Sequence, residues 1–252
     1  MQLQLIRHAT LLIEYAGMRL LADPMLNDAG AGPPIQNSPQ PRPNPLVPLP
    51  CPVEQVLDGV QAVLVTHTHR DHWDDAAIQL IPKDLPLFCQ PEDQSKMEAT
   101  HFLNTAPVHD ARHWSKICIT RTGGQHGTGE IGKAMAPVSG YVLTNDQEPT
   151  LYIAGDTIWC KEVAEAIHRY HPDVIVVNAG GARFLQGDPI TMTAEDVIQV
   201  CRAAPHARVI AVHMEAINHC LVTRRDLAHA AQKAAVKVEI PSDGEMVIFD
   251  SQ

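Results

Sequence analysis

Four side chains of metal-ligand type crowd into one short stretch of this chain. His67, His69, Asp71 and His72 directly follow the apolar run 62–66. Because alternate side chains of an extended strand point the same way, His67 and His69 can converge on one ion. Asp71 and His72 can then swing toward a second ion as the chain turns into the next helix. Burying such a cluster without a metal would carry a desolvation cost, so the spacing predicts a site for two divalent cations.

Two cations in such a site would favour hydrolysis. A water shared by two cations loses a proton near neutral pH and becomes a hydroxide nucleophile. The Asp71 carboxylate can orient this hydroxide and take up its proton after attack. The substrate carbonyl or phosphoryl oxygen would lie against one cation, which stabilises the developing negative charge. Nitrogen and carboxylate ligands suit zinc, manganese or iron, and zinc is the ion we expect.

Short apolar runs separated by turn residues supply the strand ends on which these side chains must sit. The Ala16-Gly17 turn between two such runs favours an antiparallel hairpin. Antiparallel and alternating strand-helix signals occur in both halves, which favours an α/β protein with two packed mixed sheets and outer helices over one doubly wound sheet. The expected strands are 3–6, 11–15, 18–22, 61–65, 85–89, 116–121, 138–144, 150–154, 173–177, 208–212, 236–240 and 246–249, and the expected helices are 74–81, 91–100, 161–170, 193–203 and 223–235.

Residues 27–52 form a proline-rich segment that interrupts this alternation. Nine of its positions are proline, which removes hydrogen-bond donors and excludes regular helix or central strand. Two interpretations stay open: an irregular surface connection, or a rim loop of the proposed site, since the metal-ligand motif follows next. The length of 252 residues suits one large α/β domain, and we expect residues 1–252 to form it.

Charge and composition limit which binding partners and which cellular compartment we expect. The 19 Lys and Arg residues are outnumbered by 29 Asp and Glu, and no basic run is interleaved with aromatics, so nucleic acid is a poor candidate partner. The first residues lack the layout of a secretion signal, and no apolar stretch approaches the roughly 18 residues of a membrane span. The six cysteines form no C-x-x-C pair and are expected to be reduced. We therefore expect a soluble cytoplasmic protein, with a homo-oligomer left open.

The metal-ligand motif also carries a family resemblance. The run His67-x-His69-x-Asp71-His72 resembles the H-x-H-x-D-H signature of the metallo-β-lactamase superfamily and matches it at every ligand position. An early His8-Ala9-Thr10 strand and an Asp23-Pro24 turn are similar to the branch that contains L-ascorbate-6-phosphate lactonase and N-acylphosphatidylethanolamine-hydrolysing phospholipase D. The resemblance covers almost the whole chain. It implies a four-layer αββα sandwich of two mixed β-sheets with outer helices.

The superfamily pattern implies a third ligand for the first metal, after the strand expected at 116–121. His126 lies there in a glycine-rich loop and resembles that ligand. His109 and His113 are its rivals, although they precede the strand and lack the glycine setting.

The same pattern implies a bridging aspartate and a last histidine. Asp156, at the exit of the strand 150–154, resembles the bridging residue, with a helix N-terminal carboxylate as the plainer alternative. The last ligand should follow the strand 208–212, where His213 is the better placed candidate and His219 the competitor.

Weaker candidates surround these ligands. His8 and Asp23 rest on the branch resemblance; Asp23 could accept a hydrogen bond from the outer nitrogen of a ligand histidine, and turn formation explains it equally well. Arg183 suits a substrate phosphate or carboxylate, although a surface arginine is the better interpretation. Cys160 and Cys220 fall near proposed ligands, where buried packing is their plainer role.

These features predict a metal-dependent hydrolase that uses a hydroxide bound to two metal ions to cleave a small ester, lactone or phosphodiester. A non-catalytic binding module that keeps the fold and binds a metal or ligand is the alternative from another class. The chain leaves no room for the fused flavin domain of flavodiiron relatives. True β-lactamase action is disfavoured because the ligand set contains no cysteine and no exported precursor is apparent.

Overall fold

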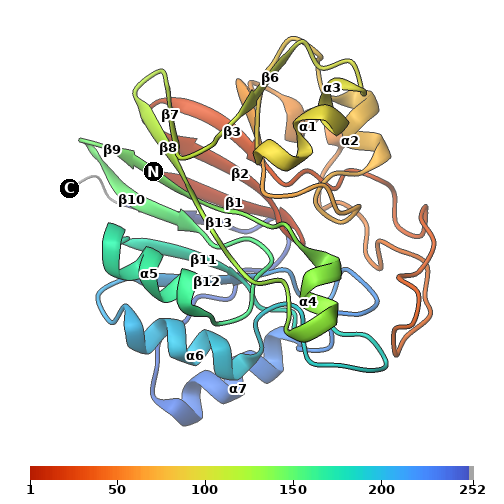
Figure 1. The fold of residues 1–252 in the computed structure, drawn as a ribbon, viewed down its shortest axis with the longest axis vertical. Coiled ribbons are helices and arrows are strands. Elements are labelled where there is room, and N and C mark those ends of the chain that lie inside the picture. Colours follow the sequence, from red (N-terminus) through yellow and green to blue (C-terminus); the bar gives the residue numbers. More distant parts are fainter. Residues whose placement is uncertain (250–252) are drawn as a thin grey trace.

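Two β-sheets packed face to face form the centre of the molecule (Figure 1). The structure, a computed structural model, describes residues 1–249. Within these residues the first sheet has seven strands in the order β13-β1-β2-β3-β4-β5-β6, parallel from β3 to β6 and antiparallel elsewhere. Its strands are β1 (Gln2–Arg7), β2 (Thr10–Tyr15), β3 (Met18–Ala22), β4 (Ala62–Val65), β5 (Pro86–Cys89), β6 (Asn104–Pro107) and β13 (Met246–Ile248).

The second sheet is also mixed. Its six strands follow the order β12-β11-β10-β9-β8-β7, with β10, β11 and β12 parallel and the others antiparallel. They are β7 (Ala111–Trp114), β8 (Ile117–Thr122), β9 (Gly140–Asn145), β10 (Glu148–Ile153), β11 (Val174–Asn178) and β12 (Arg208–Val212). Two mixed sheets are the arrangement that the sequence predicted.

Apolar clusters lie between the two sheets and on the outer face of each sheet, and the outer clusters explain why helices cover these faces. Alternate residues of a strand face opposite sides of its sheet. Leu64 of β4 and Ile153 of β10 therefore meet in the core between the sheets, whereas Val63 and Val65 pack outward against the first helices. The outer face of the second sheet packs against the later helices in the same way (Figure 1). The helices are α1 (Val53–Leu57), α2 (Asp75–Leu80), α3 (Gln94–Glu98), α4 (Gly129–Met135), α5 (Lys161–Tyr170), α6 (Ala194–Ala203) and α7 (Arg224–Ala234).

Strand direction determines where polar side chains gather. β4 ends at Val65, β10 at Ile153 and β12 at Val212, and each strand is followed within a few residues by a histidine or aspartate of the expected site. β4 belongs to the first sheet, and β10 and β12 to the second. The expected site therefore takes side chains from both sheets.

Some local expectations were wrong. Residues 236–240 form no strand; Glu239 makes one isolated bridge to Ile210 of β12. The helix expected at 91–100 is a short 3₁₀ turn, Pro91–Asp93, followed by α3. The short elements α1, α4, β6 and β7 were not anticipated. Within residues 1–249, no helix combines the length and apolar character needed to cross a bilayer.

Candidate metal centre

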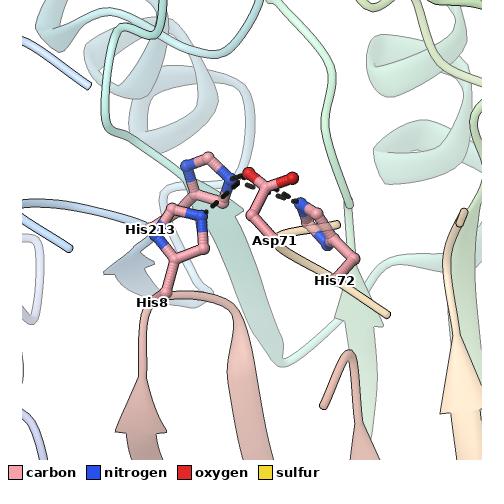
Figure 2. A group of neighbouring side chains, drawn as sticks. All are labelled: His8, Asp71, His72 and His213. Atoms are coloured by element: carbon pink, nitrogen blue, oxygen red, sulfur yellow. Dashed lines mark hydrogen bonds and ion pairs between the residues drawn. The ribbon is translucent and has the colours of Figure 1, made fainter. Parts of the chain in front are cut away.

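The seven expected metal ligands lie together where strands of the two sheets end. Their donor atoms fall into overlapping groups, each with its atoms within 4.8 Å of one another: His67, His69 and His126; His67, His72 and Asp156; and Asp71, His72 and His213 together with His8. Figure 2 shows the last group, in which the His8 and His213 rings lie side by side and the Asp71 carboxylate faces them. Strands that are distant in sequence thus bring the predicted side chains to one place.

Asp156 connects these groups. Its Oδ2 lies 3.4 Å from His126 Nε2 and 3.3 Å from His72 Nε2. Its Oδ1 lies 3.2 Å from His213 Nε2, and Oδ2 is 3.9 Å from His67 Nε2. The Asn178 amide donates to Oδ1 at 2.7 Å and so orients the carboxylate. One carboxylate therefore faces histidines of all the groups, as a carboxylate between two ions would.

The spacing of the donor atoms fits bound cations. His72 Nε2 lies 3.3 Å from His213 Nε2, and His67 Nε2 lies 2.8 Å from His69 Nδ1. Two unprotonated imidazole nitrogens repel each other, so each facing pair needs either a proton or a cation between its nitrogens. Two ligands held about 2.0–2.1 Å from a tetrahedral zinc lie roughly 3.3 Å apart. This nitrogen and carboxylate set fits divalent cations such as zinc, manganese or iron.

Asp23 holds the outer nitrogen of His72. His72 Nδ1 lies 2.8 Å from Asp23 Oδ2. The same carboxylate accepts hydrogen bonds from the Thr66 amide at 2.7 Å and from the Thr66 hydroxyl at 2.8 Å. If His72 Nε2 bound a metal, Nδ1 would carry the proton and donate it to Asp23, which would fix the ring orientation.

Two other rings have comparable partners. His126 Nδ1 lies 2.6 Å from the Ile190 carbonyl oxygen. His213 Nδ1 lies 3.6 Å from the thiol sulfur of Cys220, which the sequence had placed near the ligands. Each ring can therefore keep its inner nitrogen unprotonated while the outer nitrogen donates.

Three residues in or beside the cluster have a left-handed backbone. The φ angles are 61° at His8, 44° at Asp23 and 66° at His213. This conformation costs about 1–3 kcal/mol for a residue other than glycine and persists where surrounding contacts enforce it. Such contacts are present: the His213 N–H donates to the His8 carbonyl at 2.8 Å, and His8 Nε2 lies 3.1 Å from Asp71 Oδ2.

Burial and charge divide the histidines into two electrostatic classes. Burial lowers the pKa of His126 to about 4 and that of His67 well below its usual value, which leaves both neutral. Burial is the largest single influence on His213 and opposes its protonation, but Asp156, Cys220 and Asp71 together outweigh burial and raise the pKa of His213 to about 10. The pKa of His72 is raised well above its usual value in the same way, by Asp156, Asp23 and Asp71. His72 and His213, the second class, therefore lie where positive charge is favoured, and either protons or a cation can supply it.

The structure separates the expected ligands from their rivals. His109 and His113 are exposed and take no part in the described clusters of possible ligands. His219 is buried against Phe184, with ring centroids 6.2 Å apart, and is also outside those clusters. Arg183 donates to the carbonyl of Gly187 in its own loop.

Comparison with known proteins connects this geometry to a family. The family model described as "Beta-lactamase superfamily domain" matches residues 19–214, which include all seven expected ligands. The chain belongs to the metallo-β-lactamase superfamily. The two-sheet architecture with outer helices is that of this superfamily.

Relatives of this metallo-β-lactamase chain match over its full length. The UPF0173 protein YddR of Bacillus subtilis is 38% identical over 99% of this chain and 100% of its own. The crystal structure of isothiocyanate hydrolase from Delia radicum gut bacteria is 40% identical, covers 100% of both chains and has a TM-score of 0.95. A possible metal-dependent hydrolase from Veillonella parvula is 33% identical over 98% of both chains, with a TM-score of 0.94. The chain is a metal-dependent hydrolase of this superfamily.

Sequence reasoning missed one residue that supports the superfamily motif. The buried Asp93 accepts hydrogen bonds from the Thr68 amide at 3.1 Å and the Thr68 hydroxyl at 2.8 Å. Thr68 lies between His67 and His69. Asp93 follows β5, the parallel neighbour of β4, so the rule that parallel strands exit at the same edge could have identified it.

Proposed function

We propose that this metal-dependent hydrolase uses two divalent cations, held by the seven clustered residues, to hydrolyse a small uncharged substrate. The main support is Asp156, whose two oxygens face His126 and His72 on one side and His213 on the other. When bound, two cations that share a water lower its pKa and supply hydroxide while polarising the substrate.

The side chains of the chain have separate tasks in this proposal. Asp71 Oδ2 lies 3.1 Å from His8 Nε2, which can donate to it and so orient the carboxylate. The carboxylate also lines a neighbouring pocket, so it can hold the attacking water and accept its proton. Asp23 holds the His72 ring, and Asn178 holds Asp156. Because these contacts exist before substrate arrives, little reorganisation is needed during attack.

The substrate we propose is a small electrophile without net charge. Besides the expected ligand Asp71, the pocket beside the cluster is lined by two carboxylates, Asp74 and Asp75, and one cationic side chain, Arg70, which favours an ester or lactone over a phosphodiester. An isothiocyanate is the specific candidate, because the isothiocyanate hydrolase is 40% identical over the whole chain. Water would add to its central carbon, and the resulting thiocarbamic acid would divide into an amine and carbonyl sulfide. The six free cysteines are consistent with action in the cytoplasm.

Replacement of His126 by alanine tests the metal role. This change removes a nitrogen that faces Asp156, so we expect the purified variant to lose at least half of its bound metal and turnover to fall at least 100-fold. Metal content by elemental analysis and kcat with benzyl isothiocyanate and phenyl acetate are the measurements. His109→Ala is the matched control because His109 is exposed, and it should retain both properties.

The same measurements distinguish catalysis from a non-catalytic binding module. A binding module would take up metal yet hydrolyse no ester, lactone, phosphodiester or isothiocyanate. Full metal content and full turnover in His126→Ala would contradict the proposed site. Turnover of phosphodiesters alone would retain the two-cation site and overturn the proposed uncharged substrate.

A further inference from the structure

The proline-rich segment forms one wall of a pocket beside the metal centre. The pocket has a volume of about 370 Å³, within the roughly 300–1,000 Å³ of typical small-molecule sites. Its lining combines segment residues such as Pro34 and Ile35 with Asp71 of the cluster. A larger hollow of about 950 Å³ lies near α6 and α7, but none of the seven clustered residues lines it.

Arg7 ties together the two ends of this wall. It is fully buried and precedes His8 in the chain. Its guanidinium donates to the backbone carbonyls of Met25 at 2.8 Å, Asn27 at 2.9 Å and Val47 at 2.9 Å. A buried charged donor with several carbonyl partners fixes backbone more firmly than a neutral donor would. The two ends of the segment are thereby tied to the turn that carries His8.

Asn218 holds the middle of the wall. It is fully buried and follows His213 by five residues. Its Oδ1 accepts from the Ile35 amide at 2.9 Å and the Asn44 side chain at 2.7 Å. Its Nδ2 donates to the Ser38 hydroxyl at 2.5 Å and the Gln40 carbonyl at 2.6 Å. One amide thus satisfies polar groups of a segment that contains no helix or strand among its residues 27–52 (Figure 1).

The pocket wall that these contacts hold in place is mainly apolar beside the expected metal ligands. Met25 and Ile217 are buried and pack together, with Ile35 and Val47 against them. Met25, Ile217 and Ile35 also line the pocket. Proline needs little further ordering when a ligand binds, because its ring already fixes φ. The pocket is therefore suited to an apolar group that fits a preformed shape.

We propose that this pocket binds the apolar group of the substrate and that Arg7 and Asn218 are positioning residues that set its size. The inference rests on the proposed hydrolase function, since it places the reacting carbon at the cluster and the organic group against the proline-rich segment. Arg7 directly precedes His8, and Asn218 lies in the loop that begins at His213. The wall and the metal centre are thus built on the same two turns.

Filling the pocket tests this proposal. Gln36 lines it, whereas the exposed Gln40 of the same segment does not. We would compare Gln36→Trp, the matched control Gln40→Trp and the unaltered protein, each loaded with zinc. Calorimetry would measure the binding of benzamide and acetamide, two uncharged and unreactive probes. Kinetics would give the ratio of kcat/KM for benzyl over methyl isothiocyanate.

The proposal predicts that benzamide binds at least 10-fold more tightly than acetamide and that Gln36→Trp removes this preference. The benzyl-to-methyl ratio should fall at least 10-fold in Gln36→Trp and stay unchanged in Gln40→Trp, with zinc content constant in both. Asn218→Ala should reduce the same preference without loss of zinc. Equal binding of the two probes to the unaltered protein, or an unchanged preference in Gln36→Trp, would overturn the pocket proposal. Probe binding as predicted without turnover of any substrate would instead refute the proposed function.

Discussion

Asp93 shows how a single carboxylate outside the cluster can control the spacing of two expected ligands. Its Oδ2 accepts from the Thr68 amide and from Gln90, and Oδ1 accepts from the Thr68 hydroxyl and Lys96. All four partners are donors. Burial opposes ionisation, but Lys96, Thr68 and Gln90 lower the pKa of Asp93, so the carboxylate is charged at neutral pH.

An Asp93→Asn substitution should therefore disturb the ligands on both sides of Thr68. The new NH₂ group would face donors, and a buried unsatisfied group costs about 1–3 kcal/mol. We expect a stability loss of that size and a kcat about 10-fold lower, measured by urea denaturation and steady-state kinetics. Glu98→Gln, on the exposed face of α3, is the control. Wild-type values for both quantities in Asp93→Asn would show that Thr68 needs no such anchor.

At the scale of elements, close packing between turns matters as much as strand direction. Gly180 follows β11, and a Cβ atom built there would collide with the His213 carbonyl and lie 2.9 Å from Cys220 Sγ. Gly180→Ala should therefore displace the turn that carries His213. We expect a loss of about 1–3 kcal/mol from overpacking and weaker zinc retention against a chelator.

A matched glycine makes this prediction specific. A Cβ at Gly123 would meet only the Glu162 side chain, at 3.2 Å from its Cγ, and that side chain can move away. Gly123→Ala should therefore lose less stability than Gly180→Ala in the same urea titration. Equal losses in the two variants would show that contact with His213 is not the cause.

The cluster could be predicted because its members follow recognisable strands. Asp156 and His213 directly continue apolar runs, and the motif at His67 continues another. The short polar strand β7 could not be predicted in this way, because three of its four residues are exposed and leave no apolar alternation. Residues 236–240 have alternating apolar residues, yet only Glu239 bridges to β12, so the pattern indicated extended backbone without a full strand. The role of Asn218 could not be predicted, since its hydrogen-bond partners depend on the path of the proline-rich segment.

The whole molecule should depend on pH differently with and without metal. In the metal-free protein the pKa of His213 is raised to about 10 from an ordinary value near 6.5. A raised folded-state pKa gives stability that is full below about pH 6.5 and is lost as the pH rises toward 10. His126, lowered to about 4, has the opposite effect: its contribution is present above about pH 6.5 and is lost as the pH falls toward 4.

Chelator-treated protein should therefore be most stable near pH 6.5 and lose up to about 1.4 kcal/mol per pH unit for each proton involved. Urea denaturation at a series of pH values measures this. Zinc-loaded protein should lose little stability between pH 6.5 and 9, because the cation replaces the proton on His213. A flat profile for the metal-free protein over this alkaline range would contradict the electrostatic account of the cluster.

The two sheets come from consecutive stretches of chain, and this division constrains how the protein can change during evolution. Except for β13, the first sheet lies within residues 2–107, and the second within 111–212. Four of the seven clustered residues follow the first sheet's strand β4, and the other three follow strands of the second. Neither stretch holds a complete set, so a change that shifts strand ends in one must be matched by the other. Insertions and deletions should consequently accumulate in lineages at the opposite strand ends, where no such matching is required.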